Sequence, residues 1–305
     1  IDPTHTRLAL RGAFEDYTYF FTRIDAQPSH CAVGVPSTPT SNFEVFADVM
    51  SDHYAFFEVR NTDWDALVEQ NRGRISDDMS DDELWTVLID MVRIIIDGHL
   101  TISRLKDGQR QTFMPGRGRK QQSNNPLAAT LNPPPGRRFG EWYDDYKSSI
   151  LSELLADQGQ IIARARVIYG MLSENVGYLN VLKMGGYAEG LGWSLEDFQV
   201  ETDALNDALD EALTHMSSAQ AIVVDATYNG GGFDYLGREI AARFTDTPIL
   251  GSHRSPANIA SVKPQPLYTL PTERVSFAGP VVVLTSTLTL SASESFVLHM
   301  QAMPH

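Results

Sequence analysis

The chain has 305 residues, of which 42% are hydrophobic and 21% are charged, and its formal net charge is -15. This acidity disfavours nonspecific nucleic-acid binding, which depends on Lys and Arg side chains that neutralise phosphates, and no apolar run approaches the roughly 18 residues of a membrane span. The single cysteine, Cys31, excludes an internal disulfide framework and a cysteine-rich zinc site, and we interpret it as a small apolar residue.

The N-terminal part of the chain predicts extended pieces followed by helices. Residues 1–41 contain an aromatic cluster around Tyr19 and then a Pro- and Ser-rich break, which is typical of an extended segment and a loop. From Asn42, apolar residues spaced three and four apart predict a helix face made by Phe43, Phe46, Val49, Met50, Tyr54 and Phe57. Residues 42–104 are therefore expected to form a helical subdomain.

A second helix is predicted over residues 80–96. Ser80 and Glu83 fit a capping box at its start. Its inner face is predicted to carry Leu84, Val87, Leu88, Met91, Ile94 and Ile95. Gly98 follows as a stop signal, so His99 lies just past a helix end, where a side chain can reach a cleft.

Residues 105–172 are expected to contain a basic, Pro-rich loop and a long helix. The stretch from Lys106 to Phe139 predicts a solvated loop, with a lid or substrate anchor as the alternative. An amphipathic helix is predicted over residues 141–165, with Ile150, Leu154 and Ile161 on one side.

The last third of the chain, residues 173–305, alternates between strand and helix patterns. Buried strands are predicted over 176–181, 221–226 and 280–285, and helices over 202–216, 233–244 and 293–303. This alternation is typical of an α/β fold with a mostly parallel sheet and right-handed crossovers.

Ser291 stands where a buried strand passes through a polar turn into a helix. Free backbone N–H groups at a helix N-terminus favour negative charge, including the charge on a carbonyl oxygen under attack. Ser291 is therefore a candidate nucleophile. The alternative is structural, because Ser291 and Glu294 also match the S-x-x-E capping box.

Two further signals can complete such a site. The motif Asn229-Gly230-Gly231-Gly232 follows a strand directly, and glycine N–H groups can approach a developing oxyanion closely. A phosphate-binding loop is one alternative, but the motif lacks the lysine and the Ser or Thr of a P-loop. A tight turn without a binding role is the other alternative. His99 can serve as a general base if the fold brings it to the serine, although a lone histidine is also typical of a surface position.

These motifs resemble peptidase family S41, which includes C-terminal processing proteases, tricorn-type proteases and related retinoid-binding repeats. The segment Asp225-Ala226-Thr227-Tyr228-Asn229-Gly230-Gly231-Gly232, followed by Ser291-Ala292-Ser293-Glu294, carries the resemblance, and Asp97-Gly98-His99 is similar to the Asp-x-His element of that family. The likeness extends from about Phe43 to His305.

The resemblance implies a crotonase-like core in residues 173–305, with an N-terminal helical subdomain. It implies Ser291 as nucleophile, His99 as the base of the tricorn-like branch, and oxyanion donors at the N–H of Ala292 and of Gly232 or Gly231. Glu294 would have a supporting role. No metal or organic cofactor is needed.

The chain departs from the family pattern at several positions. Thr227 stands where arginine is usual and Leu100 where threonine is common, and no PDZ-type segment separates His99 from Val176, which favours the tricorn-like branch. The expected orienting glutamate, or the lysine of the other branch, would follow His305, so we expect the catalytic core to be C-terminally incomplete. Lys183 is a weak substitute for that lysine.

The sequence thus predicts a serine peptidase that acts on peptides or unfolded proteins, with a periplasmic or secreted location favoured by the resemblance. The alternative is a noncatalytic module that binds an apolar ligand on the same fold. An acyl-CoA enzyme of crotonase type would share the oxyanion site but gives no reason for a serine at position 291. Substrate sequence, cleavage position and oligomeric state are not indicated.

Overall fold

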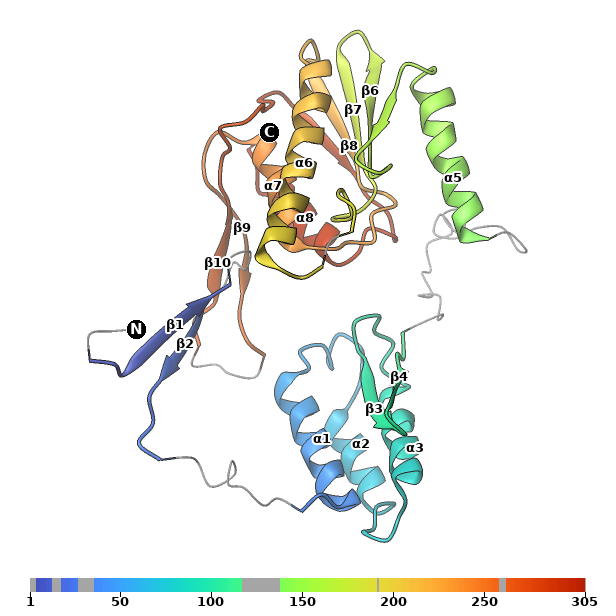
Figure 1. Cartoon of the computed structure of the whole chain (residues 1–305), viewed down its shortest axis with the longest axis vertical. Coiled ribbons are helices and arrows are strands. Elements are labelled where there is room, and N and C mark those ends of the chain that lie inside the picture. Colours follow the sequence, from blue (N-terminus) through green and yellow to red (C-terminus); the bar gives the residue numbers. More distant parts are fainter. Residues whose placement is uncertain are drawn as a thin grey trace. The chain divides into compact units, whose positions relative to one another are not determined.

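The computed structural model describes residues 4–12, 18–26, 36–116, 138–190, 192–257 and 262–304. The chain divides into two compact units (Figure 1). Unit 1 comprises Ile1–Phe21, Ser123–Arg254 and Gln265–His305, and unit 2 comprises Thr22–Gln122 and Ser255–Pro264. Cys31 and most of the predicted basic loop lie outside the described residues.

The described residues of unit 2 form three helices and one hairpin. The helices are α1 (Pro39–His53), α2 (Trp64–Arg72) and α3 (Asp81–Val92), and the antiparallel hairpin is β3 (Ile102–Lys106) with β4 (Gln109–Phe113). The predicted capping box of α3 is confirmed, because the Ser80 N–H donates to Glu83 Oε2 (2.8 Å) and the Glu83 N–H donates to Ser80 Oγ (3.3 Å).

The core of unit 2 is formed where the three helices meet. Its buried residues are Phe43, Ala47, Met50, Trp64, Val68, Leu84, Val87, Met91, Val92, Ile95 and Leu100. Two predicted inward positions are wrong: Val49 and Ile94 are 50% and 54% exposed. The buried stripe of α1 follows Phe43, Ala47 and Met50, so Val49 turns outward, and α3 ends at Val92 before it can carry Ile94 inward.

The centre of unit 1 is a five-stranded sheet. Its strand order is β11 (Val281–Leu284), β8 (Ala221–Asp225), β7 (Val176–Val181), β6 (Val167–Ser173) and β5 (Gln160–Ile162). β11, β8 and β7 run parallel, whereas β6 pairs antiparallel with β7 and β5 pairs antiparallel with β6. The predicted mostly parallel sheet is therefore corrected to a mixed one, because the link between β6 and β7 is too short for a crossover.

Helices cover both faces of this sheet. α6 (Leu195–His215), α7 (Asp234–Ala241, continued by the 3-10 turn Ala242–Phe244) and α8 (Ala292–Gln301) contribute to the larger core together with Val167 and Tyr169 of β6. Ile168, which alternates between them, packs on the opposite face in a second cluster with Ile150. Figure 1 shows α6 lying along the sheet.

The helix predicted over residues 141–165 is shorter in the structure. α5 (Phe139–Ser149) continues into the π-helical turn Ile150–Leu154, and the chain then enters β5. Ala156 and Asp157 adopt φ of 49° and 61°, which ends the helix. As a result Leu154 and Ile161 do not continue one buried stripe, and both are largely exposed.

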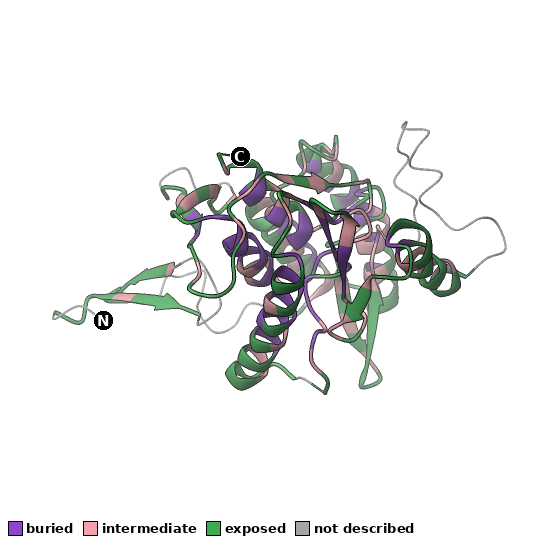
Figure 2. Cartoon of the chain, turned by 90° about the horizontal axis from the view of Figure 1, so that it is seen from above, coloured by how far each residue is buried: buried purple, intermediate pink, exposed green. Residues whose placement is uncertain are grey.

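Two further hairpins belong mainly to unit 1. β9 (Ile249–Arg254) pairs with β10 (Gln265–Thr269), and β1 (Arg7–Arg11) pairs with β2 (Thr18–Thr22). Figure 2 shows β1 and β2 almost entirely exposed. The amide of Gln265 holds the N–H and the carbonyl of Thr18 at 2.9 Å each. None of the helices in the described ranges has both the length and the apolar character needed to cross a bilayer.

Candidate active site

Ser291 occupies a strained position between β11 and α8. Its backbone has φ 58° and ψ -126°, a combination that residues other than glycine rarely adopt and that costs on the order of 1–3 kcal/mol. The Ser291 N–H donates to Glu294 Oε2 (2.7 Å), and the Glu294 N–H donates to the Ser291 carbonyl (2.9 Å). Glu294 therefore supplies the glutamate arm of a capping box and holds the serine backbone at the start of α8.

The glycine turn, residues 229–232, packs directly on Ser291. A Cβ built on Gly231 would lie 2.7 Å from the Cβ of Ser291, 2.6 Å from the Leu290 carbonyl oxygen and 3.0 Å from the Ala292 nitrogen. Gly231 also has φ 89°. Any side chain at this position would collide with the Ser291 Cβ and with the backbone on either side of it, which explains why the turn requires glycine here.

The N–H of Gly232 points away from the neighbouring chain segment. Met184 donates its N–H to the Gly231 carbonyl (3.0 Å) and accepts one from the Phe233 N–H (2.8 Å), as in a parallel bridge. The peptide groups of Gly232 then face the opposite edge. No acceptor among the described residues is hydrogen-bonded to the N–H of Gly232 or of Ala292, whereas the Gly231 N–H donates to Asn229 Oδ1 (3.0 Å). Gly232 and Ala292 thus offer two N–H donors beside Ser291.

Three hydrogen bonds tie the serine loop, residues 285–291, to residues 226–229, which lead into the glycine turn. The Ser286 hydroxyl donates to the Thr227 carbonyl, and the Thr289 hydroxyl donates to the Ala226 carbonyl (2.9 Å). The Leu290 N–H donates to the Asn229 carbonyl (3.1 Å). Both loops follow neighbouring parallel strands, so their ends meet at one edge of the sheet and are held there as one structure.

A buried carboxylate, Asp225 at the end of β8, supports the segment that leads into the glycine turn. Asp225 accepts hydrogen bonds from the hydroxyls of Tyr178 (2.6 Å) and Tyr146 (3.1 Å) through Oδ2, and from the N–H (2.8 Å) and hydroxyl (2.6 Å) of Thr227 through Oδ1. Burial first, and then the charge of Asp225, raises the pKa of Tyr178, so this phenol stays protonated as a donor. Thr227, at the position where the family resemblance leads us to expect arginine, thus satisfies the carboxylate with a short side chain.

His99 lies in unit 2, past the end of α3. Its N–H donates to Asp97 Oδ1 (2.9 Å), and its ring Nδ1 lies 3.8 Å from the same oxygen. The side chain of His99 is 74% exposed, whereas that of Asp97 is only 4% exposed. The imidazole is therefore accessible beside a fixed carboxylate.

Asp97 is held ionised by its partners. Burial opposes ionisation, but the Tyr54 hydroxyl (2.7 Å), the His99 N–H and Arg60 (3.8 Å) together lower the pKa of Asp97.

The structure brings Ser291, Gly231, Gly232, Ala292 and Glu294 together in unit 1. Because His99 belongs to unit 2, its action on Ser291 stays a prediction. Lys183 is exposed at the end of β7, immediately before Met184.

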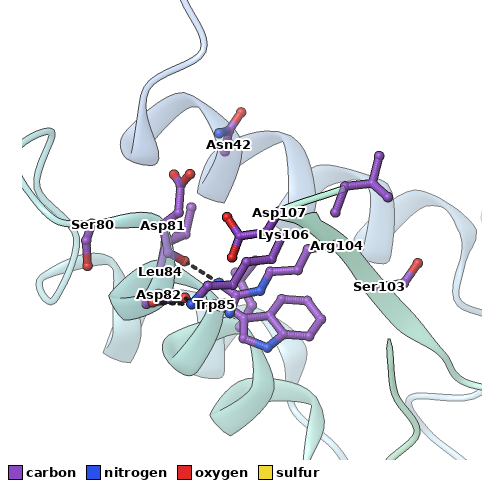
Figure 3. Close-up of a pocket in the computed structure, with 12 residues that line it drawn as sticks. Asn42, Ser80, Asp81, Asp82, Leu84, Trp85, Ser103, Arg104, Lys106 and Asp107 are labelled. Atoms are coloured by element: carbon purple, nitrogen blue, oxygen red, sulfur yellow. Dashed lines mark hydrogen bonds and ion pairs between the residues drawn. The ribbon is translucent and has the colours of Figure 1, made fainter. Parts of the chain in front are cut away.

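A cavity of about 660 Å³ in unit 2 contains none of the site residues predicted from the sequence. It lies between α1, α3 and β3, where Figure 3 shows Asp82 paired with Arg104 and Lys106. Both pairs measure 2.6 Å, and the Arg104 guanidinium lies 5.1 Å from the ring centre of Trp85. Its charged groups thus largely satisfy one another.

Comparison with known proteins gives two family matches. Residues 175–305 match the model of peptidase family S41, and residues 37–93 match the model of the tricorn protease C1 domain. The first range includes Ser291 and the glycine turn, whereas His99 lies between the two ranges. None of the curated proteins matched the chain.

Solved structures show the same fold. A candidate peptidase from Parabacteroides merdae is 24% identical, with a TM-score of 0.57, over 88% of this chain and 74% of that one. Mature CPAF, solved in complex with lactacystin, is 12% identical, with a TM-score of 0.50, over 87% of this chain and 82% of that one. The chain is thus similar to these proteins in its mixed α/β architecture.

Proposed function

We propose that the chain is a serine peptidase of family S41, whose model matches residues 175–305, and that it hydrolyses peptide bonds with Ser291 as nucleophile. The substrates are peptides or unfolded proteins, and unit 1 follows the crotonase-like core of the family. The observation that carries this proposal is the strained backbone of Ser291 packed on Gly231, with the N–H groups of Gly232 and Ala292 beside it.

In this mechanism the Ser291 hydroxyl oxygen attacks the carbonyl carbon of the scissile peptide bond. The Ser291 proton passes to the His99 imidazole, and the carbonyl oxygen becomes an oxyanion that the N–H groups of Gly232 and Ala292 bind. The protonated imidazole then gives its proton to the leaving amine as the C–N bond breaks. Water, deprotonated by His99, hydrolyses the resulting ester and restores Ser291.

The N-terminus of α8 supports the same oxyanion. Ala292 is the first residue of α8, so its N–H has no partner inside the helix. The partial positive charge of a helix N-terminus is closest at this position. The arrangement favours negative charge as it develops, and it requires no group from outside the chain.

The proposal is tested by comparing peptide hydrolysis of the wild type and Ser291→Ala. We expect the substitution to reduce kcat by about 10³-fold or more while thermal unfolding is unchanged. Ser295→Ala, one turn into the same helix, is the matched control and should keep its activity. Equal hydrolysis by the wild type and Ser291→Ala would refute the assignment, and saturable binding of an apolar ligand without hydrolysis would favour a noncatalytic module.

A further inference from the structure

Four aromatic side chains gather beside the glycine turn in unit 1, and we call them the aromatic patch: Trp193, Phe198, Phe233 and Tyr235. Their rings meet mostly edge to face. The ring centres of Phe198 and Phe233 are 5.4 Å apart, and those of Trp193 and Phe233 are 5.8 Å apart. The patch lies where α6 and α7 both begin, with Trp193 just before α6 and Phe233 just before α7.

The aromatic patch is open to solvent at one end. Trp193 is 81% exposed and the adjacent Leu195 is 65% exposed, whereas Phe198, Phe233 and Tyr235 are only partly buried. Large aromatic side chains lose much favourable burial when they stay in water, and a clustered exposed patch of them marks a binding surface more often than a scattered one does.

The patch is continuous with the proposed oxyanion site. Phe233 follows Gly232 directly, so their Cα atoms are about 3.8 Å apart. The Phe233 N–H is fixed by the Met184 carbonyl (2.8 Å), which anchors the ring next to the edge that Gly232 presents. Apolar surface therefore begins within one residue of the N–H that would bind the reacting carbonyl.

The opposite wall of the patch is held by a buried carboxylate. Glu201 of α6 is 3% exposed and accepts the N–H groups of Gly186, Tyr187 (2.9 Å) and Ala188 (3.0 Å). This pins the loop after β7, in which a Cβ on Gly185 would come 3.3 Å from the Phe233 ring. The patch is thus formed before any ligand arrives.

We propose that the aromatic patch is the subsite for a bulky apolar side chain of the substrate, on the residue next to the scissile bond. This inference rests on the proposed peptidase function. An extended peptide advances about 3.3 Å per residue, so a peptide whose carbonyl lies at Gly232 places a neighbouring side chain over Phe233 and Trp193.

The charges around the patch favour this occupant over an anionic lipid surface or an acidic peptide. Glu196 and Asp197 open α6 beside Trp193, whereas Asp234, which opens α7 beside Phe233, is paired with Arg254 (2.9 Å). The chain as a whole carries a net charge of -15. Acidic side chains at the scissile bond would meet like charge, whereas phenylalanine and leucine side chains would bury apolar area against the rings.

The test uses the full-length protein and a mixture of peptides of defined sequence, with cleavage sites mapped by mass spectrometry. In the wild type we expect kcat/KM for sites flanked by Phe or Leu to exceed that for Ala or Asp by about tenfold or more. Trp193→Ala and Phe198→Ala should each reduce this preference several-fold. Phe56→Ala, at a 52% exposed aromatic in unit 2, should leave it unchanged.

A second readout separates the subsite from the chemistry. The rate at which a small fluorophosphonate labels Ser291 should be the same in the wild type and in Trp193→Ala, because the reagent needs no aromatic subsite. Normal labelling with an unchanged cleavage profile in both variants would overturn the subsite alone. Variants that change their oligomeric state but keep the wild-type cleavage profile would overturn it too. A wild type that neither labels nor cleaves would overturn the subsite together with the peptidase function.

Discussion

At the scale of single residues, the glycine turn contains a position, Gly231, that cannot readily accept another residue. A Cβ built on Gly231, whose φ is 89°, would lie 2.7 Å from the Cβ of Ser291, whereas a Cβ built on Gly230 would have no other atom within 4 Å. We predict that Gly231→Ala reduces kcat/KM by about 10²-fold, because the methyl group pushes Ser291 away from the two N–H donors. Gly230→Ala is the matched control.

Steady-state kinetics of the two glycine variants check this prediction. Gly230→Ala should keep activity within a few-fold of the wild type, since its side chain would point into open space. A Gly231→Ala variant as active as Gly230→Ala would show that the contact with Ser291 has no catalytic consequence.

His299 of α8 is a buried histidine that we expect to stay neutral. Its ring is completely buried, with Nδ1 2.8 Å from the Thr269 hydroxyl and Nε2 3.5 Å from that of Ser252. Burial first, and then the positive charge of Arg238, lowers the pKa of His299 to about 4, against the opposing charge of Asp234.

This shift predicts a loss of stability in acid. The unfolded chain takes up the proton near pH 6.5, whereas the folded chain resists it until about pH 4, so the free energy of unfolding falls as the pH drops through this window. Nuclear magnetic resonance titration of the His299 ring should give a pKa well below 6. A value at or above 6.5 would contradict the buried neutral ring.

At the scale of secondary-structure elements, the N-terminus of α8 couples stability to the site. The Glu294 carboxylate caps the Ser291 N–H at 2.7 Å and lies in the positive end of the helix dipole. We predict that Glu294→Ala lowers the free energy of unfolding by about 1 kcal/mol. It should also reduce activity, because the Ser291 backbone loses its anchor.

Urea denaturation of the variant, with exposed Glu174→Ala as control, measures the change in unfolding free energy. If both glutamate variants were equally stable and equally active, the cap would have no role in holding Ser291.

The elements that could be predicted from sequence are those whose pattern is decided locally. β7, β8 and β11 are mainly apolar segments between turn signals, and they form close to the predicted positions. β9 and β10 carry polar residues such as Ser252 and Gln265, so the local sequence pattern did not predict a hairpin there. The antiparallel β6 was likewise missed, and with it the mixed character of the sheet.

The site follows the same rule. Ser291 and the glycine turn were found because strand, turn and helix signals adjoin them in the sequence. The support that Tyr146 and Tyr178 give to Asp225 was not predicted, because these residues lie 79 and 47 positions away and meet it only through the fold. The aromatic patch was not predicted for the same reason, since Phe198 lies in α6 whereas Phe233 lies just before α7.

At the scale of the whole molecule, unit 2 has a core of its own. The buried residues of this core lie between Phe43 and Leu100, and partly buried neighbours extend it to Phe113. We therefore predict that a fragment spanning residues 36–116 folds by itself, with a cooperative thermal transition by circular dichroism. A fragment with the spectrum of a random coil would show that unit 2 depends on unit 1.

The proposed base lies in unit 2 and the nucleophile in unit 1, so activity should require both units. We predict that His99→Asn lowers kcat/KM by about 10²-fold or more, because an asparagine side chain cannot take up the serine proton. His53→Asn, at the end of α1, is the control histidine variant. Full activity of His99→Asn would remove His99 from the mechanism.

The central claim is that Ser291 is an activated nucleophile, and covalent labelling tests it most directly. The full-length protein is treated with a fluorophosphonate, digested, and mapped by mass spectrometry. We expect one phosphonate adduct, on the peptide that contains Ser291, formed in the wild type and absent from Ser291→Ala. Labelling on a different residue, or no labelling of a folded wild type, would contradict it.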